Sequence, residues 1–451
     1  MKQKNHDLTT APVFPCLLAF TFPILCSILL QITYGTVDLL IVSNFASTGD
    51  LSGVTIGDQV MKTLTNFSAG IAMGTTILLG RFIGEKKPEK ATQVVGVSLA
   101  FFLCLALVMI AVIWLFVDQI ATALNTPETA YEQMTNYLKI TGSGAIFIVF
   151  YNLLGSVFRG LGDSKTPLYA VGIACVINIA LDLLFVAVFS WGASGAAFAT
   201  VTAQGCSVLI SFAFLRKKEL PFSLSPSDVK LEKKTAFSIV SLGFPVALQS
   251  VLVGISFLVI TSIINVFGEA SSAGGGVVEK ITGLIMVVPI AFMQSLSAFT
   301  AQNLGANKMD RAKQALVYAI GISLVFGGVM AYIAGFHGTL LTQFFVKDQE
   351  EVTMAALEYL RSYAIDTVLV CFIFSFTGFF NGCGKTKFVM CQAVLGAVFI
   401  RIPLAYYFSS LENTNLFLIG LATPASTAVQ IILFFFYYYW CFVRKPTQNK
   451  I

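Results

Sequence analysis

The segment FPILCSILL, residues 22–30, has a counterpart in FPVALQSVL, residues 244–252, which begins 222 positions later in a chain of 451 residues. A near-constant separation across a whole chain indicates two copies of one unit. Three more pairs keep almost the same separation: YLK at 137–139 with YLR at 359–361, FRGLG at 158–162 with FNGCG at 380–384, and GRFIGEKKPEKATQ at 80–93 with AQNLGANKMDRAKQ at 301–314.

The chain is too apolar for a soluble protein. Hydrophobic residues make up 56% and charged residues only 11%, against roughly 25% charged in an average protein, and the mean hydropathy is +0.82. Most of its apolar segments are long enough to cross a bilayer, which takes about 20 helical residues. About twelve such segments are predicted, at 14–45, 53–80, 93–117, 131–157, 166–190, 194–215, 237–267, 274–301, 315–340, 353–380, 388–409 and 415–443.

The sequence therefore predicts an all-α polytopic membrane protein, with twelve transmembrane helices in two parallel six-helix repeats. Because six is an even number, both copies keep the same orientation in the membrane. Secondary transporters use this arrangement, and their substrate cavity lies between the halves. The predicted division is an N-terminal lobe at 1–215 with helices 1–6, a polar cytoplasmic linker at 216–236, and a C-terminal lobe at 237–451 with helices 7–12.

Lysine and arginine set the predicted orientation. Most of the 28 basic residues fall in the terminal segments and in the loops on the same side as these, such as 81–90 and 216–234. Loops on the opposite side carry acids, including Asp118, Glu128 and Glu412. Basic loops stay inside, so both termini are predicted to be cytoplasmic, in a multi-pass protein of the plasma membrane. Topology accounts for the net charge of +5, and no nucleic-acid partner is expected.

The stretch INIALDLLF, residues 177–185, places Asn178 and Asp182 four residues apart on one face of an apolar helix. A carboxylate there is costly and is a functional-site hypothesis by default; the alternative is an Asp that caps or joins helices. Asp38 and Thr200 fall at a similar depth, roughly 10 Å below the outer surface at 1.5 Å per residue. All four residues belong to the N-terminal lobe and are predicted to share one polar pocket.

Ion coupling is the chemistry that such a pocket offers. In a low-dielectric site the neutral form of a carboxyl is favoured, and a second carboxyl nearby adds to the effect, so a proton can bind and leave. Alternatively, two carboxylates, an amide oxygen and a hydroxyl form an oxygen shell for Na⁺. The matching positions in the second repeat are Ile260 and Leu404, so the site is expected in the N-terminal lobe alone. No other cofactor or metal is expected, because the chain has two histidines and no CxxC pair.

Other polar residues in the spans are predicted to line the substrate cavity. Met and aromatic side chains adapt to varied apolar ligands, although plain helix packing is the alternative for them. For the charged members, the alternatives are an ion pair between the lobes and a solvated site near the surface. Asp366 and Arg401 are instead expected to pair within the C-terminal lobe, in a structural role with a role in transport as the alternative. The predicted cavity residues are Gln31, Tyr34, Asp58, Gln249, Glu279, Lys280, Met286, Met293 and Gln294.

Several motifs occur in order in the first half, and two of them have echoes in the second half at Pro245 and Gly305. They are Pro23, Gln31, Tyr34 and Asp38 in the first span, GRFIG at 80–84, FRGLGDSKTP from 158, NIALD from 178 and GAAFAT from 195. With these motifs the chain resembles the multidrug and toxic compound extrusion (MATE) transporters over nearly its whole length.

The resemblance is to the prokaryotic, DinF-like branch, and it implies that Asp38, Asn178, Asp182 and Thr200 form the ion-responsive cluster. It leaves H⁺ and Na⁺ both open. The NorM-like branch instead places a Glu in the seventh helix and an Asp in the tenth, where this chain has Val253 and Val370. The ion site of that branch is therefore expected to be absent.

The predicted function is secondary active efflux of organic cations or amphiphiles in exchange for H⁺ or Na⁺, by alternating access. A flippase for a lipid-linked oligosaccharide or lipid precursor is the alternative, although pyrophosphate recognition favours several arginines, and the spans offer few cations: Lys62, Lys280 and Arg401. An enzyme is not expected, since no nucleophile–base motif or phosphate loop is present. The expected partners are small-molecule substrates and membrane lipids, and the family resemblance implies a monomer.

Overall fold

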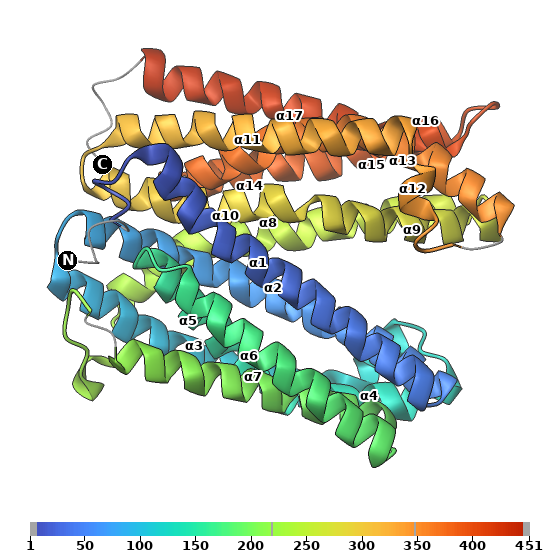
Figure 1. The fold of residues 1–451 in the computed structure, drawn as a ribbon, viewed down its shortest axis with the longest axis horizontal. Helices are drawn as coiled ribbons and strands as arrows, with labels where there is room; N and C mark the ends of the chain where they lie inside the picture. Colours follow the sequence, from blue (N-terminus) through green and yellow to red (C-terminus); the bar gives the residue numbers. More distant parts are fainter. Residues whose placement is uncertain (1–6, 218–219, 347–348, 445–451) are drawn as a thin grey trace. The chain divides into compact units, whose positions relative to one another are not determined.

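The computed structural model describes residues 7–217, 220–346 and 349–444, and within these ranges the chain forms helices without a strand (Figure 1). Ten helices are long and apolar enough to cross a membrane, and two bent helix pairs bring the number to twelve. The predicted all-α polytopic class is confirmed.

The helices of the first half form six crossings. They are α1 (Val13–Phe45), α2 (Thr48–Gly84), α3 (Pro88–Ala123), the bent pair α4 (Glu128–Ser143) and α5 (Ala145–Gly160), α6 (Lys165–Asp182) with its π-helical continuation η2 (Leu183–Val188), and α7 (Gly192–Lys217). A short 3-10 turn, η3 (Pro226–Asp228), follows within the predicted linker, whose residues 218–219 lie outside the described part of the chain.

Six further crossings follow in the second half. They are α8 (Lys233–Asn265), the bent pair α9 (Glu269–Ile285) and α10 (Val287–Gly305), α11 (Met309–Phe336) with the short α12 (Thr339–Thr342) behind it, α13 (Glu350–Gly382), then α14 (Thr386–Val394) with η4 (Leu395–Arg401) and α15 (Ile402–Ser409), and α16 (Leu416–Gly420) with α17 (Ala422–Tyr439) and η5 (Trp440–Arg444).

Each predicted segment falls on one crossing, but several helices extend a turn or more beyond their apolar stretch. For α2, a polar cap explains the extension. At the start of α2, the Ser47 hydroxyl accepts a hydrogen bond from the Asp50 amide at 3.1 Å, and the Asp50 carboxylate accepts one from the Ser47 amide at 3.2 Å. This capping box satisfies amides that the helix itself leaves free, so the helix begins before the hydrophobic pattern does.

Two segments that the sequence predicts as single spans, 131–157 and 274–301, are each broken in the structure. The first bends by 51° at Gly144, between α4 and α5, and the second by 42° at Met286, between α9 and α10. Pro289 explains the second break, because proline has no amide hydrogen to bond the carbonyl four residues earlier. At the first break, a Cβ on Gly144 would overlap the Val201 side chain, so the bend lets α4–α5 approach α7 closely.

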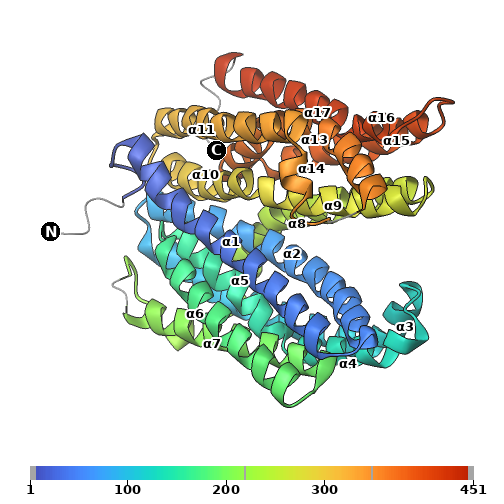
Figure 2. The ribbon, with the colours of Figure 1, turned by 45° about the vertical axis from the view of Figure 1, so that its right-hand side comes forward.

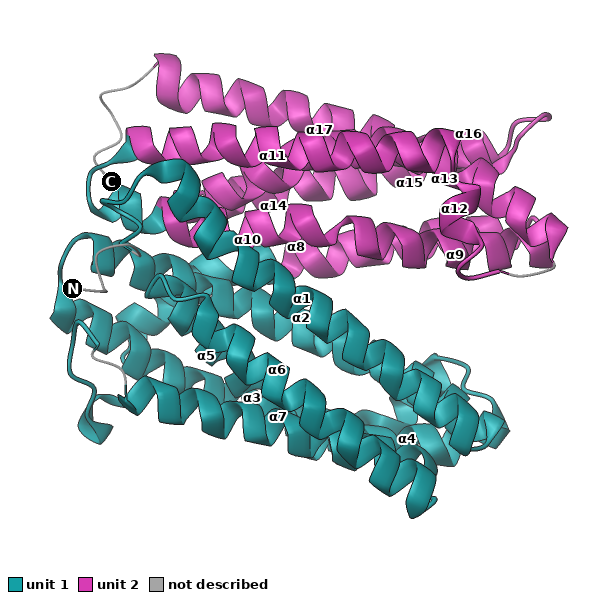
Figure 3. Cartoon of the chain, in the orientation of Figure 1, with its two compact units in different colours: residues 1–247, 301–309 teal, residues 248–300, 310–451 magenta. Residues whose placement is uncertain are grey.

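The chain divides into two compact units (Figure 3). Unit 1 consists of Met1–Ala247 and Ala301–Met309, and unit 2 consists of Leu248–Thr300 and Asp310–Ile451. The first turns of α8 and the end of α10 thus belong to unit 1. The predicted lobes at 1–215 and 237–451 stay a prediction, because these units follow spatial contacts rather than the sequence repeat.

Within unit 1, α1 packs beside α6, and α6 packs beside α7 (Figure 2). The linker covers α3, where the Thr92 hydroxyl donates a hydrogen bond to the Ser223 carbonyl at 2.9 Å and the Gln93 amide donates one to Glu232 at 2.8 Å. Within unit 2, α13 packs against α9 and α17. Each unit therefore has its own packed interior, and each contains a cavity.

Candidate functional site

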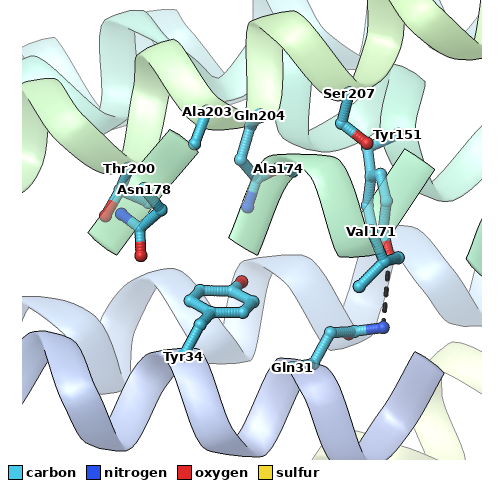
Figure 4. A pocket seen from close by; sticks show the side chains of 10 residues that line it. All are labelled: Gln31, Tyr34, Tyr151, Val171, Ala174, Asn178, Thr200, Ala203, Gln204 and Ser207. Atoms are coloured by element: carbon cyan, nitrogen blue, oxygen red, sulfur yellow. Dashed lines mark hydrogen bonds between the residues drawn. The ribbon is translucent and has the colours of Figure 1, made fainter. Parts of the chain in front are cut away.

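A small pocket lies inside unit 1, between α1, α5, α6 and α7 (Figure 4). About 30 Å³ of it is open to the centre of a water molecule, and one water needs roughly 10–15 Å³ on that measure. It therefore holds about two waters or a small ion, and is too small for an organic molecule in this conformation. Its lining residues are Gln31, Tyr34, Tyr151, Val171, Ala174, Asn178, Thr200, Ala203, Gln204 and Ser207.

The structure brings the four predicted ion-site residues into one region of unit 1. Asn178 and Thr200 line the pocket side by side (Figure 4). Asp182 lies one helical turn beyond Asn178 on α6, and Asp38 lies one turn beyond Tyr34 on α1. The two carboxyl groups interact electrostatically with each other. Asp38 and Asp182 are not among the residues that line the pocket, so one pocket shared by all four residues, and their role in binding an ion, stay predictions.

Several buried polar atoms at this site have no hydrogen-bond partner among the described residues. Asp182 is 0% exposed and Asn178 is 2% exposed; neither polar atom of the Asn178 amide has a partner, and the Asp182 carboxyl has none apart from the carboxyl group of Asp38. Asp38 is 9% exposed, and its Oδ1 is also unpartnered. Buried polar groups are paired in the great majority of cases. A cluster of such groups in one region therefore makes it the candidate site of unit 1.

Asp182 is the last α-helical residue of α6, directly before the π-helical turns of η2. Short π-helical segments of this kind often occur at functional sites. The sequence LDLLFVAV contains no glycine or proline that would have predicted the change of helix type. The irregular backbone at Asp182 is therefore a feature that sequence reasoning missed.

Asp58, predicted to line the cavity, does not line this pocket. Its carboxylate forms an ion pair with Lys62 one turn along α2, with Nζ and Oδ2 2.6 Å apart, and it interacts electrostatically with Asp38. The buried ring of Tyr137 also interacts with Asp38 and Asp182. Tyr137 belongs to the repeated YLK segment, which the sequence showed only as a marker of the repeat.

The predicted cavity residues Gln31 and Tyr34 do line the pocket. The Gln31 side-chain amide donates a hydrogen bond to the Tyr151 hydroxyl at 3.1 Å (Figure 4). Three polar lining residues that sequence reasoning missed are Tyr151, Gln204 and Ser207. Helical spacing offered a signal for two of them, since Thr200, Gln204 and Ser207 lie on one face of α7.

A larger cavity, here called the unit 2 cavity, lies inside unit 2. About 530 Å³ of it is open to the centre of a water molecule. Four predicted cavity residues line it: Gln249, Glu279, Met286 and Met293. Val253 and Val370 line it as well, so the two positions that are acidic in the NorM-like branch present apolar side chains here. Lys280 and Gln294 are not among the lining residues of either cavity, and their role stays a prediction.

The expected pairing of Asp366 with Arg401 is wrong as a direct contact. Among the described residues, no ion pair within 4.0 Å joins them, although both line the unit 2 cavity. The guanidinium is held by α8 instead: its Nη1 donates a hydrogen bond to the Ser256 hydroxyl at 3.1 Å, and its carbon lies 4.4 Å from the centre of the Phe257 ring. These contacts keep Arg401 apart from Asp366.

The described residues contain no group of three or more His, Cys, Asp or Glu side chains placed to hold a metal ion. The oxygen-rich cluster of unit 1 combines two carboxyls with an amide and a hydroxyl. Such a donor set suits a proton or a hard monovalent cation better than a transition metal.

Comparison with known sequences gives a family match in both halves. The model of the MatE family matches residues 23–184 and 245–407. The two matches begin 222 positions apart, as the FPILCSILL repeat does, so the internal repeat is confirmed. The chain is similar to probable multidrug resistance protein YoeA of Bacillus subtilis, with 26% identity covering 92% of this chain and 91% of that protein. It is also similar to multidrug export protein MepA of Staphylococcus aureus, with 24% identity over 87% of each.

Solved structures share the fold. One is described as the outward-facing conformation of a multidrug resistance MATE family transporter of the MOP superfamily, with a TM-score of 0.90 at 21% identity, covering 97% of both chains. A second, a MOP superfamily transporter from Pyrococcus furiosus described as having a binding pocket of reverse polarity, also gives 0.90, at 20% identity over 97% of both chains. At such identities the likeness establishes the fold alone.

Proposed function

Because this chain belongs to the MatE family of membrane transporters, we propose that it is a secondary active exporter of organic cations or amphiphiles, driven by inward movement of H⁺ or Na⁺. Relatives that match almost the whole chain are named as multidrug resistance and multidrug export proteins, which supports this substrate class. In the proposed orientation both termini are cytoplasmic, because the basic loops lie on the side of the termini.

The observation that carries the coupling proposal is the buried pair of Asn178 and Asp182, which has no hydrogen-bond partner among the described residues other than the carboxyl group of Asp38. An ion drives a transporter only if it binds one conformation more tightly than the other. Moving a two-state equilibrium from 1:99 to 99:1 takes about 5.5 kcal/mol of differential binding. Unsatisfied oxygens in a buried site supply such a difference, because an ion or proton that enters gains contacts which no protein group provides.

Unit 1 is the proposed place of coupling. Asp38 and Asp182 have apolar counterparts in the second repeat, Ile260 and Leu404, and Val253 and Val370 make the walls of the unit 2 cavity apolar at two further positions. The Asp, Asn, Asp, Thr pattern supports assignment to the DinF-like branch. In this proposal, the unit 1 pocket favours one conformation when it is protonated or ion-bound and another when it is ion-free. Substrate leaves when the protein changes from one conformation to the other.

Efflux from proteoliposomes tests the proposal. Purified protein is reconstituted with ethidium inside, and its release is followed under an inward pH gradient and, separately, an inward Na⁺ gradient. We expect one gradient to drive release, and Asp182→Asn to lower the driven rate at least tenfold, because an amide cannot exchange a proton or carry the charge that binds Na⁺.

Asp310→Asn is the matched control. The side chain of Asp310 is 95% exposed at the start of α11, so losing its charge should leave efflux unchanged. Gradient-driven efflux at the wild-type rate in both Asp182→Asn and Asp38→Asn would refute the coupling assignment. The gradient that supports efflux by the wild type identifies the ion.

A further inference from the structure

The unit 2 cavity has the size and composition of a ligand site. Its walls come from α8, α9, α10, α13, α14, η4 and α17, and its apolar part includes Phe257, Met286, Met293 and Phe374. Wide apolar cavities with a few convergent polar groups are the usual form of small-molecule sites. Methionine and aromatic walls fit ligands of varied shape.

Arg401 supplies a buried, permanent positive charge to this cavity. Its side chain is 6% exposed, and its Nε has no hydrogen-bond partner among the described residues. Arginine cannot lose its charge in a protein, and an unpaired charge inside a membrane protein is costly. The Ser256 hydroxyl and the Phe257 ring hold the guanidinium in place, but neither neutralises it.

Asp366 supplies an acidic group to the same cavity, and this group also has an atom without a hydrogen-bond partner. It is 2% exposed, and its Oδ1 has no hydrogen-bond partner among the described residues. The two side chains interact electrostatically, yet they are not within ion-pair distance of each other. Asp366 and Arg401 therefore face one cavity with a gap between them, and each has an unsatisfied atom. The third charged residue of the lining, Glu279, is exposed, so Asp366 is the buried acid of this cavity.

We propose that the unit 2 cavity binds an amphiphile that carries both a cationic and an anionic group. The anionic group bonds side-on to the guanidinium of Arg401, the geometry in which arginine forms its strongest hydrogen bonds. The cationic group bonds to Asp366, and the apolar body packs on the aromatic and methionine walls. A zwitterion forms hydrogen bonds with the Arg401 guanidinium and the Asp366 carboxyl at once. A ligand with one charge leaves one of these two groups unpaired in the protein interior.

Binding to purified protein tests this inference directly. The probe is Nε-dansyl-lysine, which joins a fluorescent apolar body to an ammonium and a carboxylate on one carbon. Its matched analogues are dansyl-cadaverine, which lacks the carboxylate, and 6-(dansylamino)hexanoate, which lacks the ammonium. We expect the protein in nanodiscs to bind the zwitterion at least tenfold more tightly than either analogue, as measured by the rise in dansyl fluorescence.

Two variants assign the charges. Arg401→Gln should remove the preference for the zwitterion over dansyl-cadaverine, and Asp366→Asn should remove its preference over the hexanoate. Arg361→Gln, which removes an exposed cation elsewhere on α13, should change neither. If Arg401→Gln does not fold, as judged by size-exclusion chromatography, Asp366→Asn and the three probes on wild-type protein still decide the question. Equal affinity for all three probes, or full preference in both variants, would overturn the proposal.

Two sources share the proposed chemistry: a soluble zwitterionic amphiphile and a zwitterionic lipid headgroup that carries an amine. Nanodiscs of phosphatidylethanolamine and of phosphatidylglycerol separate them. Weaker dansyl-lysine binding in phosphatidylethanolamine identifies the lipid as a competing occupant, and equal binding identifies a soluble one. Because no ion gradient is applied, the result is independent of whether the efflux proposal succeeds.

Discussion

At the scale of single residues, Asn178 is the clearest case of a side chain that is costly for the fold. Both polar atoms of its amide are buried and without a partner among the described residues. Leaving a buried polar group unsatisfied costs about 1–3 kcal/mol. A residue retained at such a cost is one whose polar atoms are used in another state of the protein, such as the ion-bound state proposed here.

This reasoning predicts that Asn178→Leu stabilises the protein while it weakens transport. Leucine has the same number of side-chain heavy atoms in the same branched arrangement and no polar atom to leave unsatisfied, so we expect a higher midpoint of thermal unfolding in detergent, measured with a thiol-reactive dye. Asn152→Leu is the control, because the Asn152 amide donates a hydrogen bond to the Ile148 carbonyl at 2.9 Å and losing it should give no gain. A lower midpoint for Asn178→Leu, together with normal efflux, would contradict the interpretation.

The sequence indicated the four predicted site residues but not which residues of the other helices lie next to them. Charged and amide groups in an apolar helix are visible in the sequence itself, and so is their depth. Which residues of other helices face them depends on tertiary packing, which single-helix periodicity does not contain. The contribution of Tyr137 from α4 and the Gln31–Tyr151 hydrogen bond therefore became evident only in the structure.

At the scale of elements, glycines on α2 bring its backbone against α8 within unit 1. A Cβ on Gly74 would overlap the Ile239 carbonyl oxygen, and one on Gly70 would overlap the Ala247 backbone. On the α8 side, a Cβ on Gly243 would overlap the Ile71 carbonyl oxygen. Small residues four apart allow this close approach between membrane helices. The GIAMG stretch at 70–74 shows the spacing, but not which helix is the partner.

We therefore expect Gly74→Ala to destabilise the protein although alanine is the better helix former. Overpacking costs about 1–3 kcal/mol, which exceeds the roughly 1 kcal/mol that alanine gains over glycine in a helix. Gly328→Ala on α11 is the matched control: nothing lies within 4 Å of its added Cβ, so it should raise the unfolding midpoint. A rise for Gly74→Ala as well would mean that α2 and α8 are not in contact in the protein studied.

Sequence patterns predicted the positions of the crossings well and their irregularities poorly. A helix that crosses the bilayer must be apolar along its length, which hydropathy detects in the sequence, so each of the twelve predicted segments has a helical counterpart. Breaks at Gly144 and Met286, and the π-helical turns after Asp182 and before Ile402, arise from how neighbouring helices pack. Pro403 gave a local signal for the second π-helical stretch, because its missing amide hydrogen disturbs the preceding turn.

At the scale of the whole molecule, the two repeats share a fold but not a chemistry. The pocket in unit 1 is small and its lining includes the unpaired amide of Asn178, whereas the unit 2 cavity is more than ten times larger by volume and its lining includes two acidic residues, Glu279 and Asp366, and one basic residue, Arg401. Duplication preserved the helices because the bilayer requires them. Individual polar residues differ between the two copies, as Asp38 against Ile260 and Asp182 against Leu404 show in the sequence itself, and an ion site in one copy alone stays a prediction.

Orientation in the membrane is the whole-molecule property that the distribution of charge predicts. The loop after α2 and the linker after α7 carry the basic residues, so both should face the cytoplasm, and the loop after α3 should face outward. We expect alkaline phosphatase to be active when fused after Asn125 and inactive when fused after Leu220, with the reverse pattern for green fluorescent protein, which fluoresces only inside the cell. Matched expression on immunoblots is the control. The opposite pattern at both positions would place the termini outside. The pocket of unit 1 would then lie near the inner rather than the outer face of the membrane, and the coupling ion would have to enter from the cytoplasm.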